Sequence, residues 1–359
     1  MSNILDYVRT YGHETFAERP FCSADALVLA QLSYMDWSSA VPCIKNNGEF
    51  IRLHDTLYVG DLEPMIRGSV FKEGNRALFY QTANSKRFGS IKLNFFTEIW
   101  NEERNMQMAA ITFLLPDGRA CVTFRGTDES LNGWRESFSI VYRFPIAAQE
   151  YAAVYLRQVA TLVDGPLIIC GHSKGGNLAV YASANCKIKI QKRIRRIYNF
   201  DGPGFPEEFF KGEGYSNIAS KIRKYVAPES FIGLLLKDKA NTFMVECKAH
   251  GMEQHDPYQW ELFGPRLRKA CKYRKERRES GYKLNKQIMS VSGEKAGRVI
   301  EGFFTAVTDV GLNKLSELNA DYALAVLRNF HQNGGYDKES IIVLGKMLLY
   351  MLPGRKILR

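Results

Sequence analysis

The stretch PLIICGHSKGGN, residues 166–177, decides the fold class that we predict for this chain. It begins with an apolar run, PLIIC, which is typical of a short buried strand. A serine between glycines follows in the pattern G-x-S-x-G, and the next residues, GNLAVYAS, predict a helix. A strand, a tight glycine turn and a helix in this order are typical of a nucleophile elbow, in which a strained turn presents a serine at the end of a strand. The sequence therefore predicts that this turn exists to present Ser173.

The segments around the elbow predict further strands and helices in alternation. Two strands joined by an Asp-Gly turn are expected within 109–126, and a long helix is expected at 145–163. Three more strand candidates follow the elbow, at 195–200, 221–227 and 242–247. Short apolar strands that alternate with longer helices indicate βαβ units. We therefore expect an α/β fold with a mostly parallel central sheet flanked by helices.

The chain is expected to divide at about residue 265. Residues 1–265 carry the strand and helix pattern and include an N-terminal helical segment, in which a helix is expected to begin near Ser23. Residues 266–359 begin with a basic connector and continue with helical patterns at about 292–352. We expect the first part to hold the chemistry, and the extra C-terminal helices to cover the sheet, form a lid or mediate assembly.

Charge is concentrated in two segments of the sequence. The 359 residues include 49 basic and 38 acidic ones, for a formal net charge of +11, and the excess lies at 187–196 and 265–287. Such patches can attract phosphate, acidic lipid headgroups or nucleic acid. Aromatic residues are too sparse in 265–287 to form a base-stacking platform, so we expect no specific nucleic-acid partner. A solvated connector is the simpler interpretation, and a peripheral contact with an anionic membrane surface is the functional one.

Cysteine usage and the N-terminus bear on the cellular compartment. Seven cysteines are scattered without a C-x-x-C pair, which favours neither a zinc site nor a disulfide framework. The first residues lack a signal-peptide pattern, and no uninterrupted apolar stretch is long enough to span a membrane. These observations predict a cytoplasmic protein that needs no metal and no cofactor.

A serine nucleophile needs a histidine base, which on such folds comes last in the chain order serine, acid, histidine. His255, in EQHDPYQW, follows the last strand candidate, where a loop can return over Ser173. We therefore predict His255 as the base, with His250 as the alternative. His331 and His172 are expected to be structural.

The acid that orients the histidine is expected at the end of a strand between Ser173 and His255. Glu229 follows the strand candidate KIRKYVA and is preferred, because that strand is nearer to the histidine loop. Asp201 follows RRIYNF and is the alternative acid, although an aspartate in an Asp-Gly-Pro-Gly turn can instead bond its own backbone.

The oxyanion that forms during attack on an ester needs backbone donors. One is expected from the N–H of Lys174, the residue after the nucleophile. The other is expected from Thr127, which follows a strand in VTFRGTDESLNGW and whose glycine neighbour lets the loop turn inward. Donors of this kind contribute a few kcal/mol in the transition state.

Several of these motifs resemble those of one enzyme group. VTFRGTDESLNGW, IICGHSKGGNLAVYAS and HDPYQW are together similar to the class 3 lipases of the α/β-hydrolase superfamily. With DALVLAQLSYMDW and YNFDGPGF, the chain resembles more specifically an uncharacterised bacterial branch of that group. The resemblance covers roughly residues 20–265. It implies the α/β-hydrolase fold and a carboxylic ester hydrolase that uses Ser173 and His255, with oxyanion donors at Thr127 and Lys174.

The resemblance also implies a lid and exposes one departure from the pattern. The lid would correspond to about 129–147, which includes the apolar and aromatic run WRESFSIVYRFPIAA. Class 3 lipases usually carry an aspartate before an apolar-proline stretch, where this chain offers Glu229 in APESFIGLLL. The DGPG motif also differs from the lipase pattern, and it keeps Asp201 in consideration.

Two functions from different classes follow. The first is a serine esterase or lipase that cleaves acyl or lipid-like esters through a serine-acid-histidine triad and an acyl-enzyme intermediate. An acyltransferase or a thioesterase could use the same triad. The second is a catalytically inactive scaffold or regulatory protein on a hydrolase fold, because a fold does not guarantee activity.

Overall fold

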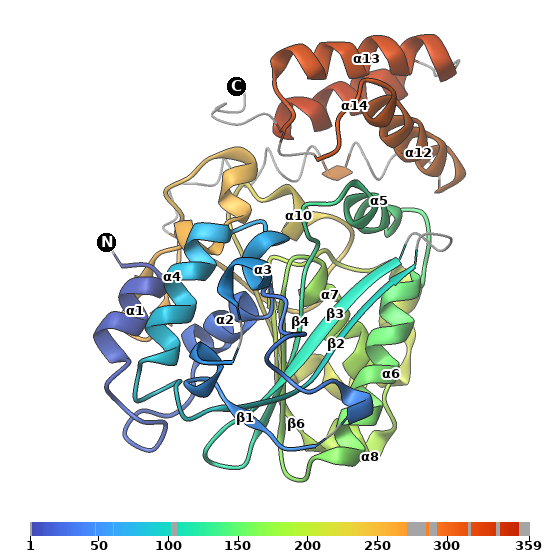
Figure 1. Ribbon diagram of the computed structural model, residues 1–359. Helices are drawn as coiled ribbons and strands as arrows, with labels where there is room; N and C mark the ends of the chain where they lie inside the picture. Colours follow the sequence, from blue (N-terminus) through green and yellow to red (C-terminus); the bar gives the residue numbers. More distant parts are fainter. Residues whose placement is uncertain are drawn as a thin grey trace.

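The structure is a computed structural model (Figure 1). It describes residues 2–46, 48–59, 61–101, 106–270, 285–286, 293–314, 317–334 and 338–351.

The central sheet contains eight strands within the described residues, and its spatial order is the chain order. The strands are β1 (Ile51–Arg52), β2 (Lys92–Asn101), β3 (Met106–Leu114), β4 (Ala120–Phe124), β5 (Leu167–His172), β6 (Ile194–Phe200), β7 (Ile222–Val226) and β8 (Asn241–Met244). The pairs from β1 to β4 are antiparallel, and those from β4 to β8 are parallel. A small separate ribbon pairs β9 (Leu262–Phe263) with β10 (Arg266–Leu267).

Helices lie on both faces of this sheet. The helices of the N-terminal part are α1 (Ile4–Tyr11), α2 (Ser23–Leu32), α3 (Leu62–Arg67) and α4 (Lys72–Ala83). Those between β4 and β8 are α5 (Leu131–Ser139), α6 (Ala147–Leu162), α7 (Lys174–Ala184), α8 (Ile188–Arg193), α9 (Glu213–Ile218) and α10 (Phe231–Leu234). The C-terminal helices are α12 (Gly293–Asp309), α13 (Ala320–Gly334) and α14 (Lys338–Met351).

The alternation of side chains along the buried strands builds two cores. Cys121 and Ile168 belong to the core under α1, α2 and α4, whereas their neighbours Val122 and Ile169 belong to the core under α6 and α7. Successive side chains of a strand point to opposite faces, so a strand covered on both sides is apolar throughout. This explains why the segment before Ser173 is a continuous apolar run.

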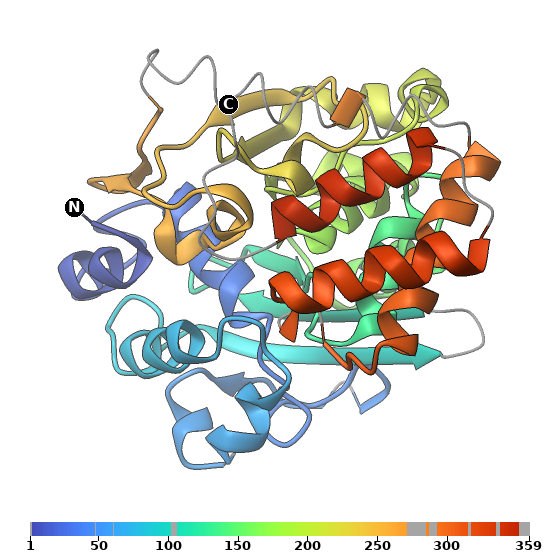
Figure 2. The ribbon, with the colours of Figure 1, turned by 90° about the horizontal axis from the view of Figure 1, so that it is seen from above.

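The C-terminal helices form a third apolar cluster at one end of the sheet. Figures 1 and 2 show α12, α13 and α14 together above α5 and α10. Phe303 and Phe304 of α12 share this cluster with Phe138 of α5 and with Phe231 and Ile232 of α10. The C-terminal unit, defined as the helices α12, α13 and α14, therefore packs directly on α5 and α10, which follow β4 and β7.

The expected α/β fold, with a mostly parallel central sheet flanked by helices and with extra C-terminal helices, is confirmed, with differences in detail. The strands expected within 109–126 and after the elbow are present, and so is the long helix α6. The helix expected from Ser23 begins there, but Cys22 is its N-cap residue. Strand β2 is absent from the predicted strands, because a bulge between Asn94 and Thr97 breaks the alternation of its side chains.

Three further expectations concern the basic segment, the division of the chain and membrane-spanning helices. Residues 271–284 and 287 of the basic segment lie outside the described residues. The division of the chain at residue 265 stays a prediction, although β10 pairs with β9 across it. Among the described residues, no helix is both long and apolar enough to cross a membrane.

Candidate active site

The serine turn has the geometry of a nucleophile elbow. Ser173 joins the end of β5 to the start of α7 with φ 58° and ψ −134°, a strained conformation for a residue with a side chain. Its glycine neighbours are required for close packing. A Cβ on Gly171 would lie 2.3 Å from the backbone of Gly175, and a Cβ on Gly175 would lie 2.1 Å from the carbonyl oxygen of Phe124. No larger residue fits at either position without moving the backbone.

A histidine and a carboxylate meet beside this turn. His255 ends a short 3₁₀ helix, Gly251–His255, and its Nδ1 lies 2.6 Å from Oδ2 of Asp201. Both residues are buried. Asp201 follows β6 directly, with a positive φ of 55°, and Ser230 donates a hydrogen bond to the same carboxylate oxygen. Because Asp201 occupies Nδ1, the Nε2 atom of His255 is left as its possible base.

The preference for Glu229 as the partner of His255 Nδ1 is wrong. Oε2 of Glu229 accepts hydrogen bonds from Gln254 Nε2 at 2.9 Å and from the Gly251 N–H at 3.3 Å. It also lies 3.5 Å from Nδ1 of His250. These contacts tie Glu229 to the segment that carries His255, so it supports the loop, whereas the alternative acid, Asp201, touches the imidazole itself.

The remaining histidines lie in different settings. His250 is the partner of Glu229 just described. His331 is exposed on α13. His172 is completely buried, and its ring centre lies 4.6 Å from that of His255. It therefore packs against the ring of the expected base. The expectation that His172 is structural stays a prediction.

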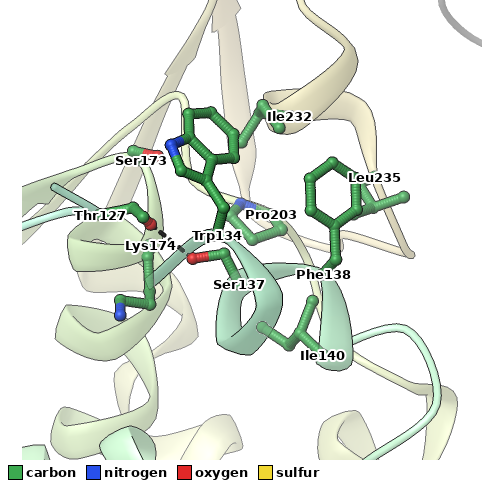
Figure 3. Close-up of a pocket in the computed structure, with 10 residues that line it drawn as sticks. All are labelled: Thr127, Trp134, Ser137, Phe138, Ile140, Ser173, Lys174, Pro203, Ile232 and Leu235. Carbon is green, nitrogen blue, oxygen red and sulfur yellow. Dashed lines mark hydrogen bonds between the residues drawn. The ribbon is translucent and has the colours of Figure 1, made fainter. Parts of the chain in front are cut away.

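The expected oxyanion donors lie next to the serine. Thr127 and Lys174 line the same pocket as Ser173, and Figure 3 shows the three close together. The hydroxyl of Thr127 forms a hydrogen bond with that of Ser137 on α5, which fixes the turn after β4. The side chain of Lys174 points away from the pocket, so its backbone is the part that faces the serine turn.

A buried ion pair joins α5 to the elbow helix. Nζ of Lys174 lies 2.7 Å from Oε2 of Glu136, and both side chains are at most 3% exposed. The same nitrogen donates to the carbonyl oxygen of Gln107 at 2.7 Å. Separating a buried pair of this kind costs several kcal/mol. Helix α5, which lies in the expected lid segment 129–147, is therefore anchored to the site.

The pocket at Ser173 is narrow and mostly apolar. It holds a cavity of about 20 Å³, which is room for roughly one water molecule. Beside the serine and the oxyanion candidates, the lining consists of Trp134, Ser137, Phe138, Ile140, Pro203, Ile232 and Leu235. In Figure 3 the indole of Trp134 lies between Ser173 and Ile232. An ester can enter this cavity only if some of the lining side chains move.

The C-terminal unit packs on the helices α5 and α10, which carry much of the pocket lining. Arg135 of α5 forms an ion pair with Glu301 of α12, and Tyr142 donates a hydrogen bond of 2.6 Å to the same carboxylate. Lys314 reaches Glu129 at 2.7 Å. Helix α14 also packs against the 3₁₀ helix that ends at His255. Sequence patterns foresaw helices here but not their position, because no local signal says which surface a helix will cover.

A substitution at Gly233 is expected to separate the acid from the histidine. A Cβ on Gly233 would lie 2.0 Å from Oδ1 of Asp201 and 2.9 Å from its Cγ. We expect Gly233→Ala to displace the carboxylate from His255 and to lower the rate of serine labelling by a fluorophosphonate by about 10²-fold. Gly68→Ala is the control, since no atom lies within 4 Å of its Cβ position. Equal labelling rates of the two variants would contradict this view of the carboxylate.

This chain is similar to known proteins in sequence and in fold. A family model described as Mbeg1-like matches residues 82–305. Among solved structures, M37 lipase is 14% identical with a TM-score of 0.36, and the match covers 58% of this chain and 68% of that one. A mutant form of MDLA from Penicillium cyclopium is 10% identical with a TM-score of 0.39, covering 64% of this chain and 84% of that one. No match was found among the curated proteins.

Proposed function

This chain belongs to the Mbeg1-like family, and we propose that it is a serine hydrolase that cleaves carboxylic esters with an apolar acyl group. The observation that carries the proposal is the contact of 2.6 Å between His255 and Asp201 beside a strained serine turn. The acid of the proposed triad is Asp201 and not Glu229. The class 3 lipase motifs at the serine and at Thr127 support the same reaction.

The reaction would proceed in two displacements. The oxygen of Ser173 attacks the ester carbonyl while Nε2 of His255 accepts its proton, and Asp201 stabilises the imidazolium through Nδ1. Collapse of the tetrahedral intermediate breaks the bond to the alcohol, which leaves with the proton from His255. A water molecule then attacks the acyl-enzyme with His255 again as base, which releases the carboxylic acid and restores the serine.

The tetrahedral intermediate carries a negative oxygen that needs donors. The backbone N–H groups of Lys174 and Thr127 are the candidates, since both residues line the pocket beside Ser173. The position of Lys174 at the start of α7 adds the favourable end of the helix dipole. The ammonium group of Lys174 forms an ion pair with Glu136, so we do not expect it to bind the substrate.

The lining of the pocket points to an apolar acyl chain as the substrate part that it binds. Trp134, Phe138, Ile140, Ile232 and Leu235 offer only hydrocarbon or ring surface, apart from the indole N–H. Because the C-terminal unit packs on α5 and α10, which carry much of this lining, we expect it to shift when substrate enters. A lipid-like ester at a membrane or micelle surface fits this arrangement. Contact of the basic segment with anionic lipid stays a prediction.

Loosening the C-terminal unit is expected to make the serine more accessible. Glu301→Ala removes the ion pair with Arg135 and the hydrogen bond from Tyr142. A partly exposed contact of this kind contributes about 1 kcal/mol, which corresponds to about a fivefold larger open fraction. We therefore expect fluorophosphonate to label Ser173 about fivefold faster in this variant. Asp117→Ala is the control, because it removes a similar ion pair, with Arg119, in the turn between β3 and β4. An unchanged or slower rate in Glu301→Ala contradicts the proposed movement.

The proposed function is tested on the unmodified protein. It is incubated with a fluorophosphonate, digested, and the labelled peptide is identified by mass spectrometry, while p-nitrophenyl esters of graded chain length are assayed in parallel. Label on Ser173 together with turnover of the longer esters supports the proposal. If Ser173 stays unlabelled in detergent micelles as well as in buffer, the chain is better described as an inactive scaffold on a hydrolase fold.

A further inference from the structure

One tyrosine hydroxyl from the N-terminal part of the chain contacts the residue that precedes the proposed nucleophile. Tyr34 follows α2, in the motif LSYMDW, and is 3% exposed. Its hydroxyl oxygen lies 2.8 Å from Nδ1 of His172, the residue before the nucleophile. Nε2 of His172 lies 2.9 Å from the backbone carbonyl oxygen of His255. A continuous path of two hydrogen bonds thus connects the N-terminal part to the backbone of the proposed base.

The direction of these hydrogen bonds follows from their chemistry. A carbonyl oxygen only accepts, so Nε2 of His172 must carry the proton that points at His255. Burial lowers the pKa of His172 well below its usual value, which keeps the ring neutral. A neutral ring with a proton on Nε2 has an acceptor at Nδ1, and the hydroxyl of Tyr34 must therefore donate to it. The tyrosine fixes the tautomer that holds the histidine loop.

The same hydroxyl lies against the turn that leads to the oxyanion donor. A Cβ on Gly126 would lie 2.1 Å from the Tyr34 oxygen and 2.7 Å from the carbonyl oxygen of His172. Gly126 directly precedes Thr127. Burial raises the pKa of the Tyr34 hydroxyl, while the backbone N–H of Gly126 acts in the opposite direction. The side chain of Tyr34 therefore contacts Gly126, which precedes Thr127, as well as His172, which is hydrogen-bonded to the backbone of His255.

The surroundings of His172 leave no room for a direct catalytic role. Its side chain is fully buried and is surrounded by the rings of Tyr34, Phe71, Trp260 and His255. Both of its nitrogens are occupied by Tyr34 and by the carbonyl of His255. A ring held in this way acts on the reaction only through the position of its neighbours.

We propose that Tyr34 and His172 are positioning residues that hold the backbone of His255 and the turn before Thr127 in register with Ser173. This inference rests on the proposed function and deepens it, because it assigns a role in the site to a motif 138 residues away from the elbow in sequence. The N-terminal segment is then part of the active site and does not merely cover the sheet.

The test compares Tyr34→Phe with Tyr155→Phe. Tyr155 is also buried, and its hydroxyl is hydrogen-bonded to Thr112 and to the carbonyl of Phe95, away from the serine. We expect Tyr34→Phe to lower kcat by about 10- to 100-fold with little change in KM for a short ester, since a small displacement of a catalytic group costs this much. The control is expected to lose similar stability but less than about twofold in kcat.

A second pair of variants tests the path through His172. His172→Gln can still donate an N–H to the carbonyl of His255 and is expected to retain more activity than His172→Leu. Adding Tyr34→Phe to His172→Leu should cost little more, because both changes interrupt the same path. Additive losses, or a kcat of Tyr34→Phe within twofold of the control, would overturn the proposal.

A spectroscopic measurement keeps the test independent of ester turnover. In ¹⁵N-histidine NMR spectra, His172 is expected to show the neutral form with a proton on Nε2, and Tyr34→Phe is expected to shift the signals of His172 and His255 while Tyr155→Phe is not. Unchanged signals in Tyr34→Phe would overturn the positioning role even if the protein hydrolysed no ester. Shifted signals without serine labelling in the native protein would instead support the link and reject the proposed reaction.

Discussion

Replacement of Ser173 with alanine is expected to lower ester turnover by at least about 10⁴-fold and to abolish labelling by a fluorophosphonate. The reason is that Ser173, in the strained turn between β5 and α7, lines the pocket together with Thr127 and Trp134 and is the proposed nucleophile. Without its oxygen no acyl-enzyme can form, and any remaining rate would come from binding and from the oxyanion donors. Turnover is followed with the p-nitrophenyl ester that the native protein prefers.

Ser183→Ala is the matched control for this substitution. Ser183 is a fully buried serine on α7 whose hydroxyl donates to the carbonyl oxygen of Ala179 at 2.7 Å. The control should fold and turn over ester at a rate close to that of the native protein. If Ser173→Ala kept the native rate, the measured hydrolysis would not use the elbow, and the proposed mechanism would be rejected.

Asp201→Asn is expected to lower kcat by about 10³- to 10⁴-fold, while Glu229→Gln lowers it by less than about tenfold. Asp201 contacts Nδ1 of His255 at 2.6 Å, and an amide there loses the charge that stabilises the imidazolium. Glu229 instead accepts hydrogen bonds from Gln254 and from the Gly251 N–H, and a glutamine keeps one acceptor oxygen for them. The kcat of each variant for one ester decides between the two carboxylates.

The opposite order of the two losses would reinstate Glu229 as the acid. Similar large losses in both variants would mean that the loop supported by Glu229 is as important as the contact of Asp201 with His255. The thermal stability of both variants should be measured alongside, because each carboxylate is buried and each substitution leaves partners with altered hydrogen bonds.

The elbow could be predicted because its cause is local. A nucleophile elbow needs an apolar strand before the serine, glycines beside it and a helix after it. Residues 166–184 contain the sequence signals for all three. The turn at Thr127 could be predicted for the same reason, since a strand, a glycine and a polar residue follow one another in the sequence. Its place beside Ser173 is observed, and its role as an oxyanion donor stays a prediction. Local steric requirements of this kind restrict the residue types so strongly that a short motif reveals them.

The carboxylate that contacts His255 is not the one preferred from the sequence, because this contact depends on which strand end lies next to the histidine. Proximity in the chain favoured Glu229, which lies 26 residues before His255, whereas Asp201 lies 54 residues before it. Yet β6 is the direct neighbour of β5, and the residue that leaves β6 therefore emerges beside the serine turn. The order of strands in the sheet, and not distance along the chain, decides which carboxylate meets the imidazole.

The sequence by itself determined the parallel strands with their helices, the elbow at Ser173 and the identity of His255 as the histidine next to the acid, because each is encoded by hydrophobic pattern or by local backbone geometry. Only the tertiary structure decided that Asp201 contacts His255, that Tyr34 contacts His172, and that the C-terminal helices pack on α5 and α10. These last features join segments far apart in the chain. Their physical cause is the packing of whole elements against one another, and a single sequence leaves that packing unspecified at the level of individual contacts.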